Sequence, residues 1–527
     1  MRDRRETKLT ASRRIVRLVV VVSATLFFGT ARPVLCKELW QLNWIEVRSP
    51  HFVVVSALPE ARTTELVVDL ENFRTAAEML TNIGRFEERI PTHIYVLPYE
   101  VPELRLDGKI VGYFLPGMRA NYAAVMPSPV KLDAVLKHEY VHFLVHNRDK
   151  LAYPTWFDEG FAELLSTLHV RGAELEYGNT LEQRIYWLEY ESWMPFTKVL
   201  DARGTASLSH TQMPMFYAQS WLLLHYLMIG RPGTNTSAEL QTFLRLRESG
   251  LASVPAFEQA FSLKVSTLQS TLRYYGSKMR YFKATLLQPY PPVQSTKHEV
   301  SPDRVAAELG TLALQHGNYA AAQHFYDYAL SAKPANAMAL VGMGDVLKNA
   351  KRYAEADANY QKAIALEPTN PLHQLDYAEY FLTLAQEEKI PERAHELFIE
   401  ARRHLARSYA LDANNPETLA ENGLTYLLEK VSPDKAVQSL ELAYELLPSQ
   451  SEIRHLLARA YIANHELDKA RPHLQALIAW AETTNAMTLQ EELNGLDAVP
   501  SAPTKQTMHE FACEHCRAGL IPNKRPN

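Results

Sequence analysis

The sequence contains little cysteine and no large excess of charge of either sign. Its 527 residues include three cysteines, Cys36, Cys513 and Cys516. Three cysteines cannot build a disulfide framework, so a hydrophobic core must stabilise the fold. The formal net charge is −5, from 55 basic and 60 acidic residues. A chain so balanced has no general field that would concentrate a polyanion, and we do not expect nucleic acid as a partner.

Two of the cysteines, Cys513 and Cys516, form a Cys-x-x-Cys pair in a polar C-terminal segment. Such a pair could be a redox couple, half of a metal site or a small disulfide loop. No second pair is present to complete a zinc site. We therefore favour a tail feature without catalytic importance.

The apolar run near the N-terminus, Leu18–Phe28, is short. A helix that spans a bilayer needs about 20 apolar residues, and this run has roughly half that number. Six arginines precede the run, and small and polar residues follow it. This plan is typical of a signal peptide, here residues 1–36, with an uncleaved N-terminal anchor as the alternative. We expect an exported protein, periplasmic or secreted, that is held at a membrane only if this segment is retained.

The length of the chain predicts two folded units, because a single core stops growing at about 250–300 residues. Residues 37–287 combine strand-like runs at 51–55, 93–97 and 121–126 with a helical period between 66 and 79, which indicates an α+β unit. Proline at 289, 291 and 292 cannot continue a helix, and we place a proline-rich linker at 288–300. Residues 301–482 form the second unit, and 483–527 form a polar tail with the Cys-x-x-Cys pair.

The second unit contains a repeat of 34 residues. Its first two copies share a glycine, two alanines and a proline in register: Gly310, Ala322, Ala329 and Pro334, then Gly344, Ala356, Ala363 and Pro368. This pattern resembles the tetratricopeptide repeat, in which small residues let paired helices approach closely. Later alanines continue the series, and residues 371–416 are longer than one repeat. We expect four to five repeats with one expanded, forming an all-α solenoid that binds a protein partner.

The first unit contains the motif His138-Glu139-Tyr140-Val141-His142 in an apolar stretch without proline or glycine. In a helix, histidines four residues apart lie on one face and can bind one metal ion, while Glu139 is turned toward a metal-bound water. Glu139 would then accept a proton from that water. His146 continues this face but is about 12 Å along the axis from His138, which is too far to share the ion.

A third ligand is expected in the segment Trp156-Phe157-Asp158-Glu159-Gly160-Phe161-Ala162-Glu163. Glu159 and Glu163 are four residues apart and share a face of a second predicted helix. Gly160 has no side chain, which would let this helix approach the first one near the metal. The alternative is a pair of solvated glutamates on an amphipathic helix.

These two motifs together resemble the gluzincin branch of zinc peptidases, the thermolysin-like and aminopeptidase-like superfamily, over roughly residues 40–285. The resemblance implies an α+β zincin-like catalytic domain in front of the repeat solenoid. It also implies one Zn²⁺ per chain, bound by His138, His142 and Glu159, with Glu139 as the catalytic residue and Glu163 orienting a ligand histidine. The gap of sixteen residues between His142 and Glu159 is slightly shorter than in the best-known members.

Two further assignments follow from the same resemblance. The segment 216–227 resembles a helix whose tyrosine hydrogen-bonds the tetrahedral intermediate, which makes Tyr217 the candidate. The alternative is that Tyr217 is a core tyrosine. His210 and His225 rank below Tyr217 as candidates. The strand 121–126 resembles a sheet edge that binds extended substrate through its backbone, and the substrate-binding candidates are Asn121, Tyr122, Ala123 and Ala124. A purely structural edge strand is the alternative.

The sequence thus favours a zinc metallopeptidase, a hydrolase that cleaves peptide bonds with a Glu-activated zinc-bound water. Its repeats would recruit a peptide or protein substrate or another protein partner. The alternative is a catalytically inactive peptidase-like scaffold whose repeats mediate protein-protein interaction. Metal-assisted hydrolysis of a non-peptide bond is a third hypothesis.

Overall fold

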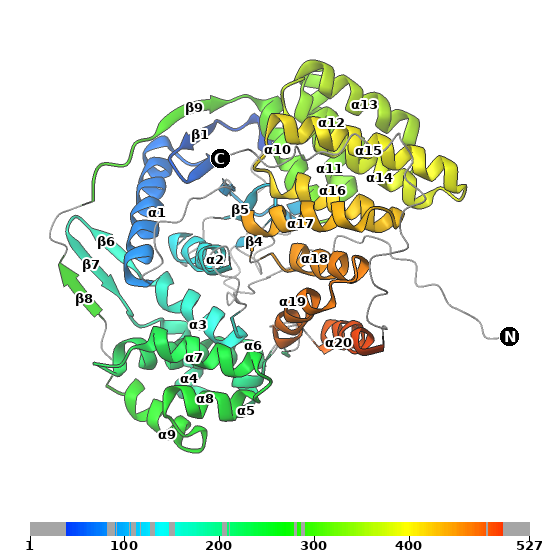
Figure 1. The fold of residues 1–527 in the computed structure, drawn as a ribbon. Helices are drawn as coiled ribbons and strands as arrows, with labels where there is room; N and C mark the ends of the chain where they lie inside the picture. The colour runs from blue at the N-terminus through cyan, green and yellow to red at the C-terminus, as the bar shows by residue number, and fades with distance from the viewer. Residues whose placement is uncertain are drawn as a thin grey trace.

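The structure is a computed structural model (Figure 1). It describes residues 38–81, 90, 92–104, 106, 112–115, 117–126, 132–146, 153–202, 208–209, 211–278, 282–285, 290–448, 450–480 and 483–498. The predicted signal peptide, the Cys513/Cys516 pair and His210 lie outside the described residues. No helix among the described residues is both long enough and apolar enough to cross a bilayer.

A mixed sheet of six strands occupies the N-terminal part. Its order is β4-β5-β3-β2-β1-β9, in which β2, β3 and β5 are parallel and the other neighbours are antiparallel. The strands are β1 (Trp44–Arg48), β2 (Phe52–Ser56), β3 (Thr92–Val96), β4 (Gly112–Leu115), β5 (Asn121–Val125) and β9 (Thr296–Val300). The three strands expected from the sequence are confirmed as β2, β3 and β5, whereas β1, β4 and β9 were not anticipated.

Two predictions about this region are wrong. The strand 121–126 is not a sheet edge, because β4 pairs with β5 on the side away from β3 and is itself the edge. The segment 288–300 is not only a linker, because its last residues form β9, which pairs with β1 from Trp44↔Val300 to Arg48↔Thr296. The chain therefore returns to the first sheet before it enters the repeats.

Both faces of this sheet are covered. On one face, Phe52, Val54, Ile94 and Val96 join a core with α1 (Glu60–Thr81) and α2 (Leu132–His146). Their neighbours in the strands, including Val53, Val55, Tyr95 and Leu97, join a second core with the first repeat helices. Consecutive side chains of a strand point to opposite faces, so the apolar runs in β2 and β3 supply both cores.

Helices dominate between residues 155 and 276, and a small sheet accompanies them. Its order is β6-β7-β8, from β6 (His169–Arg171), β7 (Glu174–Tyr177) and β8 (Phe282–Thr285). The helices are α3 (Thr155–Ser166), α4 (Glu182–Tyr190), α5 (Phe196–Asp201), α6 (Gln212–His225), the π-helical turn η4 (Tyr226–Gly230), α7 (Thr236–Glu248), α8 (Ser253–Phe261) and α9 (Val265–Gly276). Short 3-10 helices, η1 (Leu39–Gln41) and η2 (Pro102–Leu104), lie beside the sheet and contact the first repeat helix.

The described part of residues 302–480 consists of five antiparallel helix pairs. They are α10 (Pro302–Gln315) with α11 (Tyr319–Ala332), α12 (Ala337–Asn349) with α13 (Tyr353–Leu366), α14 (Pro371–Glu387) with α15 (Pro391–Leu411), α16 (Pro416–Glu429) with α17 (Pro433–Leu446), and α18 (Ser451–Ala463) with α19 (Leu467–Trp480). The expanded third pair accounts for the poor match of residues 371–416. The tail was predicted to begin at 483, but α20 (Thr483–Ala498) packs on α19.

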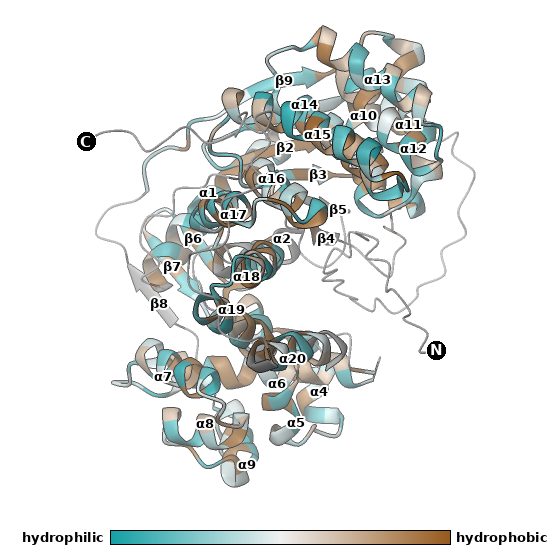
Figure 2. Cartoon of the chain, turned by 45° about the vertical axis from the view of Figure 1, so that its right-hand side comes forward, coloured by the Kyte–Doolittle hydropathy of each residue, from teal (hydrophilic) through white to brown (hydrophobic). Residues whose placement is uncertain are grey.

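The glycines of the repeat pattern have the role that the sequence indicates. A Cβ on Gly310 would lie 2.5 Å from a ring carbon of Tyr326, and one on Gly344 would lie 2.8 Å from the ring of Tyr360. Each glycine thus lets a tyrosine of the second helix lie against the first helix. The repeat helices bear hydrophilic and hydrophobic residues on different sides (Figure 2).

Candidate metal centre

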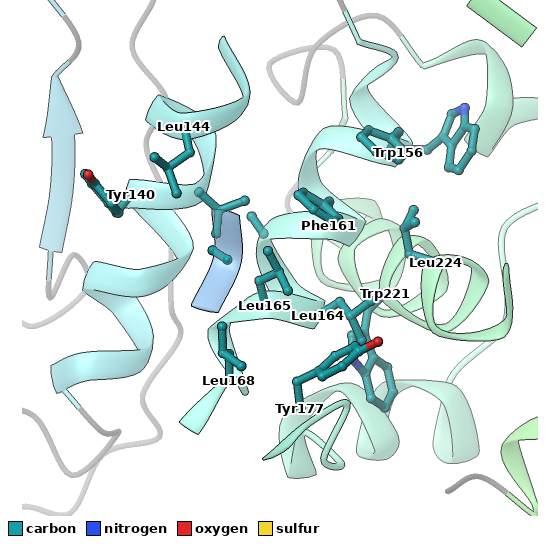
Figure 3. Packing of buried hydrophobic residues seen from close by; sticks show 14 of the residues in the cluster. Tyr140, Leu144, Trp156, Phe161, Leu164, Leu165, Leu168, Tyr177, Trp221 and Leu224 are labelled. Carbon is teal, nitrogen blue, oxygen red and sulfur yellow. The ribbon is translucent and has the colours of Figure 1, made fainter. Parts of the chain in front are cut away.

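Two buried helices carry the predicted metal ligands. Helix α2 contains no proline or glycine, and it places His138 and His142 one turn apart. Helix α3 begins directly after Pro154, whose missing amide donor is tolerated at a helix start, and it carries Glu159. Both helices join α6 in one apolar cluster, whose members include Tyr140, Leu144, Phe161, Leu164, Leu165, Trp221 and Leu224 (Figure 3).

The three predicted ligands converge. The Nε2 atoms of His138 and His142 are 3.2 Å apart, and each lies 3.4 Å from Oε2 of Glu159. All three residues are buried. Among the described residues, they are the group of three histidine, cysteine or carboxylate side chains that could hold a metal ion.

Two carboxylates lie behind the histidines. Oδ1 of Asp158 is 3.0 Å from Nδ1 of His142, and Oε1 of Glu163 is 3.4 Å from Nδ1 of His138. A proton on each Nδ1 is favoured by these carboxylates and leaves a lone pair on each Nε2. The two Nε2 lone pairs and the Glu159 oxygen then face one another, an arrangement that a cation between them stabilises.

The distances fit a tetrahedral metal ion. Zinc bonds to nitrogen and oxygen ligands are about 2.0–2.2 Å long, which puts the ligand atoms of a tetrahedron about 3.3 Å apart. The three observed separations are 3.2, 3.4 and 3.4 Å. The residues therefore fit Zn²⁺ in number, type and spacing.

Glu139 lies beside these groups in an unusual environment. Its side chain is 1% exposed, and among the described residues neither carboxylate oxygen has a hydrogen-bond partner. Burial raises the pKa of Glu139 to about 7, against the opposing charges of His138 and His142. A carboxylate with such a pKa can both accept and donate a proton near neutral pH.

Tyr217 reaches the same group from α6. Its hydroxyl lies 3.4 Å from Oε1 of Glu159, and burial together with the charge of Glu159 raises its pKa well above the usual value. The phenol therefore stays protonated and can donate a hydrogen bond. The guanidinium of Arg184 lies 5.3 Å from the centre of the Tyr217 ring.

Two residues near the centre were missed in the sequence. Asp158 precedes Glu159 directly, and the need of His142 for a partner at Nδ1 was a signal that could have found it. Arg184 on α4 donates to both oxygens of Glu163, at 2.9 and 2.6 Å. Its position 21 residues after Glu163 belongs to no local pattern, so the sequence contains no equivalent signal.

The expected role of Gly160 needs correction. A Cβ at this position would lie 2.5 Å from the carbonyl oxygen of Ser220 and 2.9 Å from Cδ2 of Leu224, both on α6. The glycine therefore allows α3 to approach α6, which carries Tyr217, and not α2 as predicted. The reason is that Gly160 follows Glu159 on α3 and faces a different neighbour.

The strand predicted to bind substrate, β5, is an inner strand of the sheet. Asn121 is fully buried, and its amide donates to Thr92 Oγ1 at 3.3 Å while its oxygen accepts from the Gly117 amide at 3.4 Å. Tyr122 and Ala124 face the core shared with the repeats, whereas Ala123 faces the opposite core. Since β5 pairs on both sides, its backbone is not open to a substrate.

His225, a lower-ranked candidate, is not part of this centre. His225 is bonded to the carbonyl of Gly178 at 2.8 Å and to the hydroxyl of Tyr275 at 2.7 Å, which is a structural role. The side chain of His146 lies outside the described part of the structure, as does all of His210.

Comparison with known proteins identifies the repeats. The tetratricopeptide repeat family matches residues 427–493 and 339–370. A thermophilic TPR protein of Thermus thermophilus is 22% identical over 37% of this chain and 100% of its own, with a TM-score of 0.32. The pilF protein of Pseudomonas aeruginosa is 20% identical over 37% of this chain and 87% of its own, with a TM-score of 0.31.

A third solved structure is YrrB, a TPR protein with an unusual peptide-binding site. It is 20% identical over 35% of this chain and 90% of its own, with a TM-score of 0.27. No curated protein matches the chain. The C-terminal half of the protein thus carries tetratricopeptide repeats behind a part with a mixed sheet, and repeats of this kind serve in protein-protein interaction.

Proposed function

We propose that this protein is a zinc-dependent peptidase with an attached tetratricopeptide-repeat solenoid. The observation that carries the proposal is the buried triangle of His138, His142 and Glu159, with separations of 3.2 to 3.4 Å. The gluzincin-like spacing of the two motifs supports the same reaction class. A zinc ion held there would supply Lewis acidity to a substrate carbonyl and lower the pKa of water.

The residues around the metal site would have separate roles in the reaction. Asp158 and Glu163 would fix the tautomers and orientations of the two histidines, and Arg184 would hold Glu163. Glu139 would take a proton from water at its carboxylate and return it to the leaving amine. The Tyr217 hydroxyl would donate a hydrogen bond to the oxyanion, a contribution of about 3 kcal/mol at such sites.

Substrate would bind along β4 in place of β5. Among the strands that the structure describes, β4 is the edge of the six-stranded sheet, and it contacts α2, the helix that carries His138 and His142. An extended peptide could add to this edge through backbone hydrogen bonds.

Zinc content of the purified protein tests the proposal first. We expect about one zinc per chain, and none in the double variant H138A/H142A. Digestion of a peptide library should then be lost in E139Q while zinc is retained. A folded wild-type chain that takes up no zinc from excess metal would refute the proposal.

The repeats support a second candidate, a catalytically inactive peptidase-like scaffold that binds other proteins. The matches to the tetratricopeptide repeat family favour this function directly. Zinc uptake without cleavage of any peptide in the library would favour the scaffold. Cleavage of a non-peptide ester or amide by a chain that leaves peptides intact would indicate the third class of function.

A further inference from the structure

A partly buried turn of the first part of the chain contacts the repeats. The turn joins β4 to β5 and contains Gly117, Met118, Arg119 and Ala120. Arg119 contacts α14 and α16, the first helices of the third and fourth repeats. First helices of successive repeats contact one another from α10 to α18, so they form the continuous layer that lines the concave face of such a solenoid.

Three carboxylates surround the guanidinium of Arg119. Its Nη1 lies 2.6 Å from Asp376 Oδ1, its Nε lies 2.8 Å from Glu417 Oε2, and its Nη2 lies 3.4 Å from Glu379 Oε1. The carboxylate side chains are only 6 to 12% exposed. Lys348 is a second cation beside this group, 3.9 Å from Glu379.

This arrangement selects a guanidinium. Each nitrogen of the planar Arg119 fork meets a different carboxylate, which the compact ammonium of lysine could not do. Met118, the preceding residue, packs against the apolar cluster of the last repeats. The repeats therefore hold an apolar residue followed by an arginine, both from the chain's own turn.

Because the contact is buried, it contributes more to specificity than to the stability of the fold. A buried ion pair contributes little net stability, because removal of its charges from water offsets their attraction. Loss of Arg119, however, would leave Asp376 and Glu417 buried without this cation. Another arginine offered from outside would then be bound in its place.

We propose that the concave face formed by α14 and α16 is a receptor for an arginine-bearing segment of a partner protein, which the chain's own Arg119 turn occupies in this structure. The partner would displace the Arg119 side chain from the carboxylates of α14 and α16, while the core that β4 and β5 share with the first repeats stays packed. The proposal does not depend on peptidase activity, because it concerns only the repeats and this turn.

Binding of a labelled peptide tests this proposal. The probe has the sequence of residues 112–124, and a control peptide has alanine in place of the arginine. All chains carry E139Q, so that hydrolysis cannot deplete the probe. If the turn occupies the face in about nine of ten molecules, only about a tenth of them can bind the probe, so we expect R119A to bind it about tenfold more tightly than the chain with Arg119.

Further variants locate the binding. Addition of D376N and E417Q to R119A should abolish the gain, and the control peptide should bind none of the chains well. R119K, which keeps the charge but not the fork, should show a smaller gain of about threefold and guards against misfolding of R119A. If neither substitution tightens binding of the probe in chains with wild-type circular dichroism, the receptor proposal is wrong.

Discussion

Substitution of Gly160 by alanine tests the packing that joins the candidate ligands to Tyr217. In the structure, the new Cβ would lie 2.5 Å from the carbonyl oxygen and 2.8 Å from the carbonyl carbon of Ser220. Both atoms belong to the backbone of α6 and cannot rotate away. Normal contact requires about 3.4 Å or more, so α3 and α6 would have to separate by roughly 1 Å at this point.

Two opposing effects set the size of the change. Alanine in place of glycine inside a helix gains about 1 kcal/mol of helix propensity. Overpacking of a buried contact costs about 1–3 kcal/mol, and the rigid backbone contact puts this site near the upper end. We therefore expect G160A to lose about 2 kcal/mol of unfolding free energy and to disturb the contact between Tyr217 and Glu159.

Urea unfolding followed by circular dichroism measures the first effect. The matched control is G495A, since Gly495 also lies in a helix but a Cβ there has no neighbour within 4 Å. G495A should lose no stability and could gain up to about 1 kcal/mol locally. If G160A is as stable as the wild type, the close approach of α3 and α6 does not have the role assigned to it.

Three further substitutions have defined outcomes. E139Q should bind zinc as the wild type does, which elemental analysis measures. Its peptide cleavage should be reduced at least about a hundredfold in a peptide digestion assay. Cleavage at the wild-type rate would contradict the role of Glu139 as base. D158N should weaken zinc binding about 10- to 100-fold in competition with a chelator, because the amide lacks the charge beside His142; unchanged affinity would exclude that role. Burial raises the pKa of Glu308 to about 7 from an ordinary 4.5, so the folded state retains a proton that the unfolded chain loses. The retained proton therefore stabilises the folded state fully below pH 4.5, by about 3 kcal/mol, and this contribution is lost as the pH rises to 7. E308Q should remove this part of the pH dependence of stability, as measured by urea unfolding.

The local parts of the candidate centre could be predicted from the sequence. His138 and His142 are four residues apart in an apolar segment without helix breakers, and helix geometry alone places them together. The prediction of Glu159 as the third ligand required only that the next helix pack against the first. Ligands that are close in sequence and lie on regular helices can therefore be predicted from their spacing.

Contacts between distant segments left no such pattern. Strand β4 has only four residues, Gly112–Leu115, and its pairing with β5 decides which strand is the edge. Arg184 meets Glu163 from another helix, and Gly160 faces α6 because of the order in which three helices pack. Each of these facts depends on tertiary arrangement, which spacing along one segment cannot supply.

The sequence nevertheless contained evidence against a repeat array that folds apart from the sheet. In β2, Phe52, Val53, Val54 and Val55 are consecutive apolar residues, and alternate members point to opposite faces of the sheet. Such strands, in a parallel arrangement like that of β2 and β3, need cover on both faces. Helices α1 and α2 cover one face, so the other requires further helices, and the repeats supply them. The solenoid therefore shares a core with the sheet, and the ion pairs of Arg119 with α14 and α16 add a second contact between the two parts.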